Sequence, residues 1–196
     1  MERQPDAKGY VLPYGDSPFD NERVGESVYL DIINRASRYV YIMTPYLIID
    51  GEMTTALTFA AKLGVDVRII LPHIPDKKVA FALAYTHYRE LIRAGVSIYE
   101  YTPGFVHAKV FLSDDSKAVV GSINLDYRSL YLHFECAAYL KDARHRRHSA
   151  RHARHARSEP AGDGGIPRPR ALDAQGDGLS AQAVRAADVR KETKPC

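Results

Sequence analysis

Hydrophobic and polar positions alternate in two rhythms along the first 140 residues. Apolar side chains recur at helical spacing over residues 24–36, 53–63 and 77–93, which predicts three amphipathic helices. Short β-favouring runs at 39–43, 66–71, 96–101, 107–113, 118–121 and 134–140 predict strands. Strands and helices alternate as far as residue 101, and strands cluster after it. The pattern therefore predicts an α/β fold, with a mixed β-sheet flanked by helices.

The chain changes character after residue 142. All of its 13 Tyr and 6 Phe lie at or before Tyr139. Residues 1–142 are predicted to form the folded domain, with an extended entry segment over 1–23. Residues 143–196 contain too few apolar side chains to offset the conformational entropy that the chain would lose on folding, so a disordered basic tail is expected. This tail is either a genuine appendage, able to tether the domain to anionic lipid or nucleic acid, or an out-of-frame reading of a G+C-rich gene.

The charge distribution follows the same division. The whole chain carries a net charge of +3, but residues 1–142 hold 15 basic and 18 acidic side chains, and the tail holds the remaining 12 and 6. A folded part with a net charge of −3 lacks the basic face that a duplex binder presents, so no nucleic-acid partner is expected. The sequence contains no apolar run of about 18 residues, so no transmembrane helix is predicted. Two cysteines, Cys136 and Cys196, make neither a disulfide framework nor a usual zinc site.

Candidate chemistry is concentrated in residues 104–136. His107 and Lys109 are two apart on a predicted strand, so their side chains are expected to project from one face. Asp114 follows at the strand end, and Ser122 and Asn124 close the next strand. An imidazole and an ammonium beside hydroxyl and amide donors suit a phosphate group. Because the protein would supply the cations itself, no metal or other cofactor is expected.

These residues follow the spacing His-x-Lys-x4-Asp-x6-Gly-Ser-x-Asn from His107 to Asn124, which resembles the signature of the phospholipase D superfamily. Segments 44–50, 64–78, 91–109 and 124–135 also look like the C-terminal half of a bacterial cardiolipin synthase, so the resemblance covers residues 9–140. It implies a phospholipase D-like fold. It assigns catalytic roles to His107, Lys109, Asp114 and Glu135 and substrate binding to Ser122 and Asn124. Glu135 falls where the family places the carboxylate that orients the histidine.

The resemblance also implies a reaction. A cardiolipin synthase moves a phosphatidyl group from one phosphatidylglycerol to a second and releases glycerol, by way of a phosphohistidine. Such enzymes carry two motifs and are preceded by membrane helices, whereas this sequence shows one motif and no such helices. We therefore expect an incomplete half, acting peripherally at the bacterial cell membrane on phosphatidylglycerol or another anionic phospholipid. His107 would be the general acid/base of a site completed by a second catalytic half or a homodimer partner.

Two other functions remain open at this point. The first is a homodimeric single-motif phosphodiesterase or nuclease, and the second is an inert truncated fragment. Individual residues also have structural alternatives. Asp114 suits a strand-terminal turn, and His87 and His133 suit structural roles. Tyr46, Phe105 and Arg128 are candidates for the substrate mouth or are ordinary residues at the ends of elements. The four histidines of the tail are read as part of an unstructured basic segment.

Overall fold

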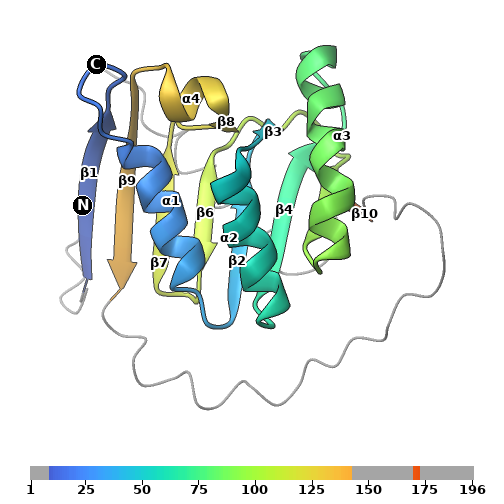
Figure 1. The fold of residues 1–196 in the computed structure, drawn as a ribbon, viewed down its shortest axis with the longest axis horizontal. Helices are drawn as coiled ribbons and strands as arrows, with labels where there is room; N and C mark the ends of the chain where they lie inside the picture. Colours follow the sequence, from blue (N-terminus) through green and yellow to red (C-terminus); the bar gives the residue numbers. More distant parts are fainter. Residues whose placement is uncertain (1–8, 143–169, 173–196) are drawn as a thin grey trace.

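The computed structural model describes residues 9–142 and 170–172. Most of them belong to an eight-stranded sheet with the order β1-β9-β7-β6-β2-β4-β5-β10 (Figure 1). Its strands are β1 (Gly9–Asp16), β2 (Tyr39–Met43), β4 (Asp66–Pro72), β5 (Ser97–Tyr101), β6 (Val110–Ser113), β7 (Lys117–Gly121), β9 (Glu135–Asp142) and β10 (Arg170–Leu172). The helices are α1 (Val24–Asn34), α2 (Gly51–Lys62), α3 (Lys78–Arg93) and α4 (Tyr127–Tyr131). Two short strands, β3 (Leu47–Ile48) and β8 (Leu125–Asp126), pair with each other.

The sheet is mixed, as predicted. β2, β4 and β5 run parallel and are connected through α2 and α3. From β2 outward through β6, β7, β9 and β1, each neighbouring pair is antiparallel. A helical crossover returns the chain to the edge where the previous strand began and so makes neighbouring strands parallel, whereas the short turn between β6 and β7 makes them antiparallel. The alternation of elements up to residue 101 and the clustering of strands after it therefore predicted a mixed sheet flanked by helices correctly.

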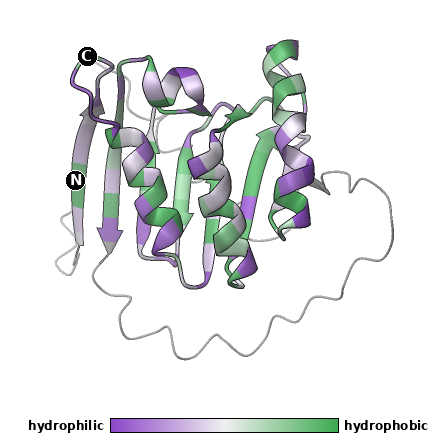
Figure 2. Ribbon diagram, in the orientation of Figure 1, coloured by the Kyte–Doolittle hydropathy of each residue, from purple (hydrophilic) through white to green (hydrophobic). Residues whose placement is uncertain are grey.

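Helices α1, α2 and α3 lie on one face of the sheet (Figure 1). They bury a single cluster in which alternate strand residues such as Val40 and Ile69 meet helix residues such as Ile32 and Leu57. Figure 2 shows that the central strands β4 and β6 are mainly hydrophobic, as expected for strands that are buried on both faces. This packing provides a rigid base for the loops at the sheet edge.

A smaller cluster lies on the opposite face. Met43, Ile70 and Val110 pack there with Val106 from the loop between β5 and β6. Ala108 packs against the same cluster, while the intervening His107 stays exposed. Packing of alternate loop residues thus holds the histidine at the edge of the sheet.

Two predicted details differ from the structure. β6 begins at Val110, so His107 and Lys109 precede the strand that was predicted to start at residue 107. Residues 9–16 form β1 rather than an extended entry segment. Pro13 cannot donate a ladder hydrogen bond, which argued against a strand, but β1 is the outermost strand and tolerates it.

The tail prediction concerns residues that mostly lie outside the described part. Within residues 143–196 only Arg170–Leu172 are described, and they form β10, parallel to β5. The division into a domain over 1–142 and a tail over 143–196 remains a prediction. Among the described residues, no helix is both long enough and apolar enough to cross a bilayer.

Candidate active site

The candidate active site lies along the row of strand ends at which β6 begins. This row of strand ends is called the edge of the sheet below. Because β6 pairs antiparallel with β7, and β7 with β9, the start of β6, the end of β7 and the start of β9 meet at this edge. These three points carry His107 with Lys109, Ser122 with Asn124, and Glu135. Antiparallel pairing therefore brings together residues that are up to 28 positions apart in the sequence.

The His107 imidazole is exposed and lies between two aromatic rings. It stacks on Phe105 at a centroid distance of 5.6 Å and meets the edge of Tyr46 at 6.2 Å. Partial burial and the charge of Lys109 lower the pKa of His107, whereas Asp76 acts in the opposite direction. The neutral imidazole that results at pH 7 has a nitrogen lone pair, which a general base or a nucleophile requires.

Lys109 is largely buried beside this histidine. Its Nζ donates a hydrogen bond of 2.6 Å to the backbone carbonyl of His107. The sequence argument expected both side chains on one strand face, but the two residues precede β6. Their proximity comes instead from this local hydrogen bond and from the loop packing. A buried ammonium at this edge favours an anionic ligand.

Ser122 and Glu135 form a second group at the same edge. The Ser122 hydroxyl donates to the Glu135 carboxylate and accepts a hydrogen bond of 3.0 Å from the backbone N–H of Cys136. The other carboxylate oxygen of Glu135 lies 3.1 Å from Nδ1 of His133. Among the described residues, no hydrogen bond joins Glu135 to His107, the partner that the resemblance implied. The structure pairs the carboxylate with His133, for which a structural role had been expected.

Asn124 has one amide atom without a partner. Its Nδ2 donates to Ser129 Oγ at 2.8 Å, whereas Oδ1 is buried and has no hydrogen-bond partner among the described residues. Rotating the amide by 180° exchanges these two atoms, so in either orientation one of them has no hydrogen-bond partner among the described residues. Buried polar groups are normally satisfied, and an unsatisfied amide atom at the same edge of the sheet as His107 and Lys109 is suited to a ligand.

The segment that carries Ser122 and Asn124 is held firmly. The buried Tyr29 hydroxyl donates to the carbonyl of Ile123 at 2.8 Å, and the N–H of Leu125 donates to the Thr44 hydroxyl at 3.2 Å. Both anchors belong to elements that lie about 80 or more residues earlier in the chain. The loop geometry therefore depends on the completed fold.

Asp114 lies at the other end of β6, away from these groups. Its carboxylate accepts hydrogen bonds from the backbone N–H groups of Ser37, Arg38 and Tyr39, at 2.8–3.0 Å. Burial alone would raise the pKa of Asp114, but these hydrogen bonds lower it overall. The structure thus does not bring Asp114 to the site, and its contacts are those of a turn residue, the alternative that its sequence context also allowed.

Other polar residues beside His107 were not singled out from the sequence. Asp76 and Lys77 follow β4, and both act electrostatically on the imidazole. Tyr46 links Asp76 to the imidazole, because its ring contacts His107 and its hydroxyl donates a hydrogen bond of 2.5 Å to Asp76. The available signal was the position of these residues directly after predicted strands, where the ends of parallel strands share one edge.

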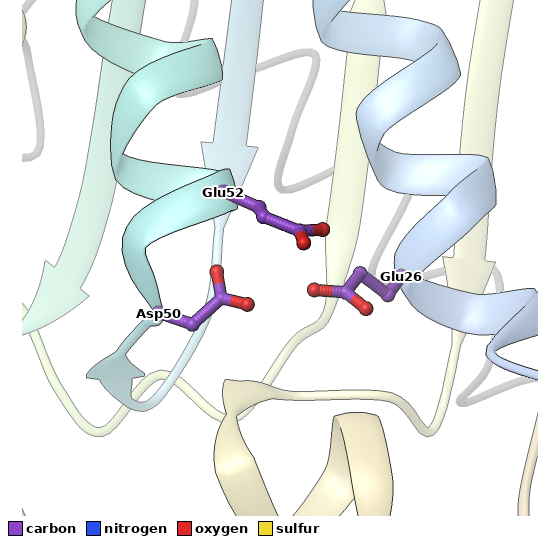
Figure 3. A group of neighbouring side chains, drawn as sticks. All are labelled: Glu26, Asp50 and Glu52. Carbon is purple, nitrogen blue, oxygen red and sulfur yellow. The ribbon is translucent and has the colours of Figure 1, made fainter.

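Three carboxylates gather between α1 and α2 (Figure 3). Glu26, Asp50 and Glu52 point toward one another, with ligand atoms within 4.8 Å. The Tyr131 hydroxyl bridges Glu26 and Asp50. Because a hydroxyl has one proton, one of these two carboxyl groups must carry a proton to complete both hydrogen bonds. Burial raises the pKa of Glu26, whereas hydrogen bonds lower that of Asp50, so Glu26 is the more readily protonated of the two. The cluster therefore ties α4 to α1 and α2.

Solved structures show the class of fold to which the chain belongs. A phospholipase D family member, Nuc from Salmonella typhimurium, superposes with a TM-score of 0.58 at 20% identity, covering 69% of this chain and 84% of that one. A phosphatidylserine synthase from Haemophilus influenzae gives 0.56 at 20% identity, covering 69% and 35%. At this identity the likeness shows the fold, which is that of the phospholipase D family.

Sequence relatives then identify the family. The family model described as "Cardiolipin synthase, PLD-like domain" matches residues 29–156, and the chain belongs to this family. A cardiolipin synthase from Geobacillus sp. strain WCH70 is 40% identical over 135 residues, covering 69% of this chain and 27% of that protein. An uncharacterized protein from Streptococcus mutans is 70% identical over 134 residues, covering 68% and 29%. The chain thus spans less than a third of the length of these two relatives.

Proposed function

We propose that this chain is one catalytic half of a cardiolipin synthase-type phosphatidyltransferase. The observation that supports the proposal is that strand pairing brings the segments of His107, Lys109 and Asn124 to one edge of the sheet, where one amide atom of Asn124 is unsatisfied among the described residues. Lys109 would balance the charge of a phosphodiester, and the Asn124 amide would hydrogen-bond one of its oxygens. The family relationship and the 40% identity to a cardiolipin synthase support this choice of reaction.

The reaction would proceed in two displacements. In the first, an imidazole nitrogen attacks the phosphorus of phosphatidylglycerol, the P–O bond to glycerol breaks, and a second imidazole protonates the departing alkoxide. In the second, that imidazole takes a proton from the hydroxyl of another phosphatidylglycerol, whose oxygen attacks phosphorus and releases the first histidine. Because the two imidazoles lie on opposite sides of phosphorus, one histidine cannot fill both places.

His107 would serve as the acid and base in this scheme. The resemblance to the C-terminal half of the family assigns it this role. Its lowered pKa makes the imidazolium a stronger acid toward the leaving alkoxide, and the neutral imidazole left after that step accepts the acceptor's proton. The nucleophilic imidazole would come from a second half, which agrees with a chain spanning 27% of the Geobacillus relative. The substrates place the reaction at a membrane surface, where the domain would act peripherally.

A homodimeric phosphodiesterase is the second candidate. The observation that favours it is that the described domain covers 84% of the Salmonella phospholipase D family member. A chain of that length has space for one such domain. Two copies of the present site, related by a twofold axis, would then supply the two imidazoles.

The deciding experiment compares the full chain with and without a source of the other half. The chain would be mixed with vesicles of phosphatidylglycerol, and cardiolipin and glycerol would be quantified over time. A parallel sample would contain the part of the Streptococcus mutans relative that lies outside the matched region. Turnover that appears only in the mixture, and disappears with His107→Ala, supports the split transferase. Turnover by the chain alone that rises with the square of its concentration supports the homodimer. Robust turnover by a verified monomer contradicts the two-histidine argument.

A further inference from the structure

Helix α3 exposes an apolar strip at the end that lies nearest His107. The inner side of the helix is buried through residues such as Ala84 and Tyr88. On the outer side, Val79 and Leu83 are four residues apart and therefore neighbours, and they are 75% and 44% exposed. Packing among the described residues does not account for these two apolar side chains.

The strip is confined to one half of the helix. Thr86 and Glu90 continue the same line of helical spacing toward the other end, and both are exposed. The outer side of α3 thus changes from apolar to polar along its length. The apolar half extends beyond the ends of the neighbouring strands (Figure 1). It can therefore enter another medium while the polar half stays in water.

The loop before α3 adds both apolar and charged side chains to this projecting end. Ile74, Lys77 and Lys78 are all exposed. Together with Val79 and Leu83 they are called the α3 tip below. The two ammonium groups suit an anionic surface, and their long stems allow them to remain in water while the apolar side chains enter hydrocarbon.

Other loops at the same edge of the sheet are apolar as well. They expose large aromatic or aliphatic side chains at Phe19, Phe105, Leu132 and Phe134. Among the described residues, the loops at the opposite edge expose one such side chain, Leu63. Apolar surface gathered on one side of a domain marks an interaction face, and here it surrounds the candidate active site.

We propose that the α3 tip inserts into the interfacial region of an anionic phospholipid bilayer and turns the edge that carries His107 toward the lipid. The inference rests on the proposed function for the nature of the substrate, and it adds the surface that makes contact and the depth of that contact. Apolar side chains of interfacial helices reach about 5–10 Å into the boundary between headgroups and acyl chains. Because the tip stands beyond the strand ends, His107 would then lie near the lipid phosphates, and a phosphodiester could reach it without leaving the bilayer.

The shape and composition of the tip favour lipid over a protein partner. A stable protein interface buries about 800 Å² on each side and surrounds an apolar centre with a polar rim. The α3 tip is the narrow end of one helix, and Lys78 adjoins the apolar Val79 directly. A fluid bilayer adapts to such a tip, whereas a protein would need a matching pocket.

The first test uses fluorescence. The chain contains no tryptophan, so a single introduced tryptophan reports only its own surroundings. Val79→Trp is compared with Leu63→Trp, a position of similar exposure at the opposite edge, each in the full chain mixed with vesicles of phosphatidylglycerol. We expect the emission of Val79→Trp to shift to the blue and to be quenched by lipids brominated near the top of the acyl chains. An unshifted Val79→Trp, or an equal response from Leu63→Trp, overturns the proposal.

The second test separates insertion from simple attraction of the basic residues beyond residue 142. Co-sedimentation with the same vesicles is measured at high salt, which screens exposed charges. The double variant Val79→Ser with Leu83→Ser should weaken binding roughly tenfold or more, because it removes two apolar side chains from the buried part. Phe59→Ser on the exposed side of α2 is the matched control and should bind as the wild type does. Equal binding by the double variant and the control contradicts insertion of the tip.

The outcomes distinguish this inference from the function on which it rests. Insertion does not require chemistry, so the blue shift of Val79→Trp should persist when His107→Ala is added. A blue shift without turnover in the reconstituted mixture overturns the proposed function and leaves the lipid surface standing. Turnover without a blue shift does the reverse. A blue shift that appears in the absence of lipid, when the other part of the Streptococcus mutans relative is added, shows that a protein partner covers the tip and overturns the lipid surface.

Discussion

The two ends of strand β6 have different tasks, although one sequence motif contains both. At the first end, His107 is exposed between two aromatic rings and Lys109 is buried beside it. At the second end, Asp114 adopts a φ of 54° and accepts hydrogen bonds from consecutive backbone N–H groups of the turn before β2. The first end presents an exposed imidazole, whereas the second uses its carboxylate to satisfy the backbone.

The difference shows that spacing along a motif does not equal proximity in the fold. A strand separates its ends by about 3.3 Å per residue, so the aspartate of the motif lies on the opposite edge of the sheet from the histidine. Its role is to anchor β2 to β6 at that edge. In this way Asp114 supports the sheet that carries His107 without contacting the site.

The largest effect is expected at the first end. In the reconstituted reaction described above, His107→Ala should lower the rate by a factor on the order of 10³ or more, because each member of a cooperating catalytic pair does little alone. Asp114→Asn in the same assay should change the rate by a small factor. Comparable losses in both variants, at equal amounts of folded protein, would remove the distinction between the two ends.

The next largest effect is expected in the packing of β7 against β9, which supports the His107 end of β6. A Cβ at Gly121 would lie 2.6 Å from the carbonyl oxygen of Cys136, and closer still to the Cβ of Ala137. Gly121→Ala should therefore lower the free energy of unfolding by about 3 kcal/mol, since β7 and β9 would have to separate. Gly51→Ala is the matched control, because nothing lies within 4 Å of a Cβ there. Denaturant unfolding measures both, and equal stabilities would contradict the close packing at this edge.

A somewhat smaller loss is expected at the second end. Asp114→Ala leaves several N–H groups of the 37–39 turn without acceptors and should cost about 2 kcal/mol of unfolding free energy. Asp114→Asn retains an acceptor oxygen and tolerates the positive φ, so it should cost less. Because the folded-state pKa of Asp114 is lowered, its contribution is present above the ordinary value of about 3.9 and is lost as the pH falls through the folded pKa. Urea unfolding at pH 7 and near pH 3 checks both statements. A loss of stability in Asp114→Ala that is as large near pH 3 as at pH 7 would contradict a contribution from the ionised carboxylate.

The smallest effect is a shift in titration. His107 should titrate below the ordinary histidine value of about 6.5, because burial and the Lys109 charge both disfavour the imidazolium. Lys109→Met should raise the midpoint of the His107 ring signal in an NMR titration. The control is Lys117→Met, which removes a lysine from the start of β7, opposite the second end of β6, and should leave the midpoint unchanged. Identical shifts in the two variants would mean that the two ends are not electrostatically separate.

Periodicity predicted the helices and most of the sheet, because the amphipathic pattern of each element reflects its burial on one side. It missed β1, whose Pro13 and glycines conceal an edge strand, and α4, which is too short to show a period. For the candidate site, motif spacing predicted His107, Lys109 and Asn124, whose segments strand pairing brings to one edge of the sheet. It did not show that Glu135 pairs with His133 and Ser122, since those contacts depend on how β9 meets the end of β7.

Residue types and their local order along the chain predicted the family and the mixed sheet, and they also supplied the candidate residues for phosphate binding. The completed fold was needed to show that Asp114 serves the turn at the far edge, that one amide atom of Asn124 is unsatisfied among the described residues, and that Tyr46 lies beside His107 and binds Asp76. The physical reason is that these relationships arise from strand pairing and from packing between segments distant in sequence. Their geometry exists only after the sheet has formed, so no local pattern records it.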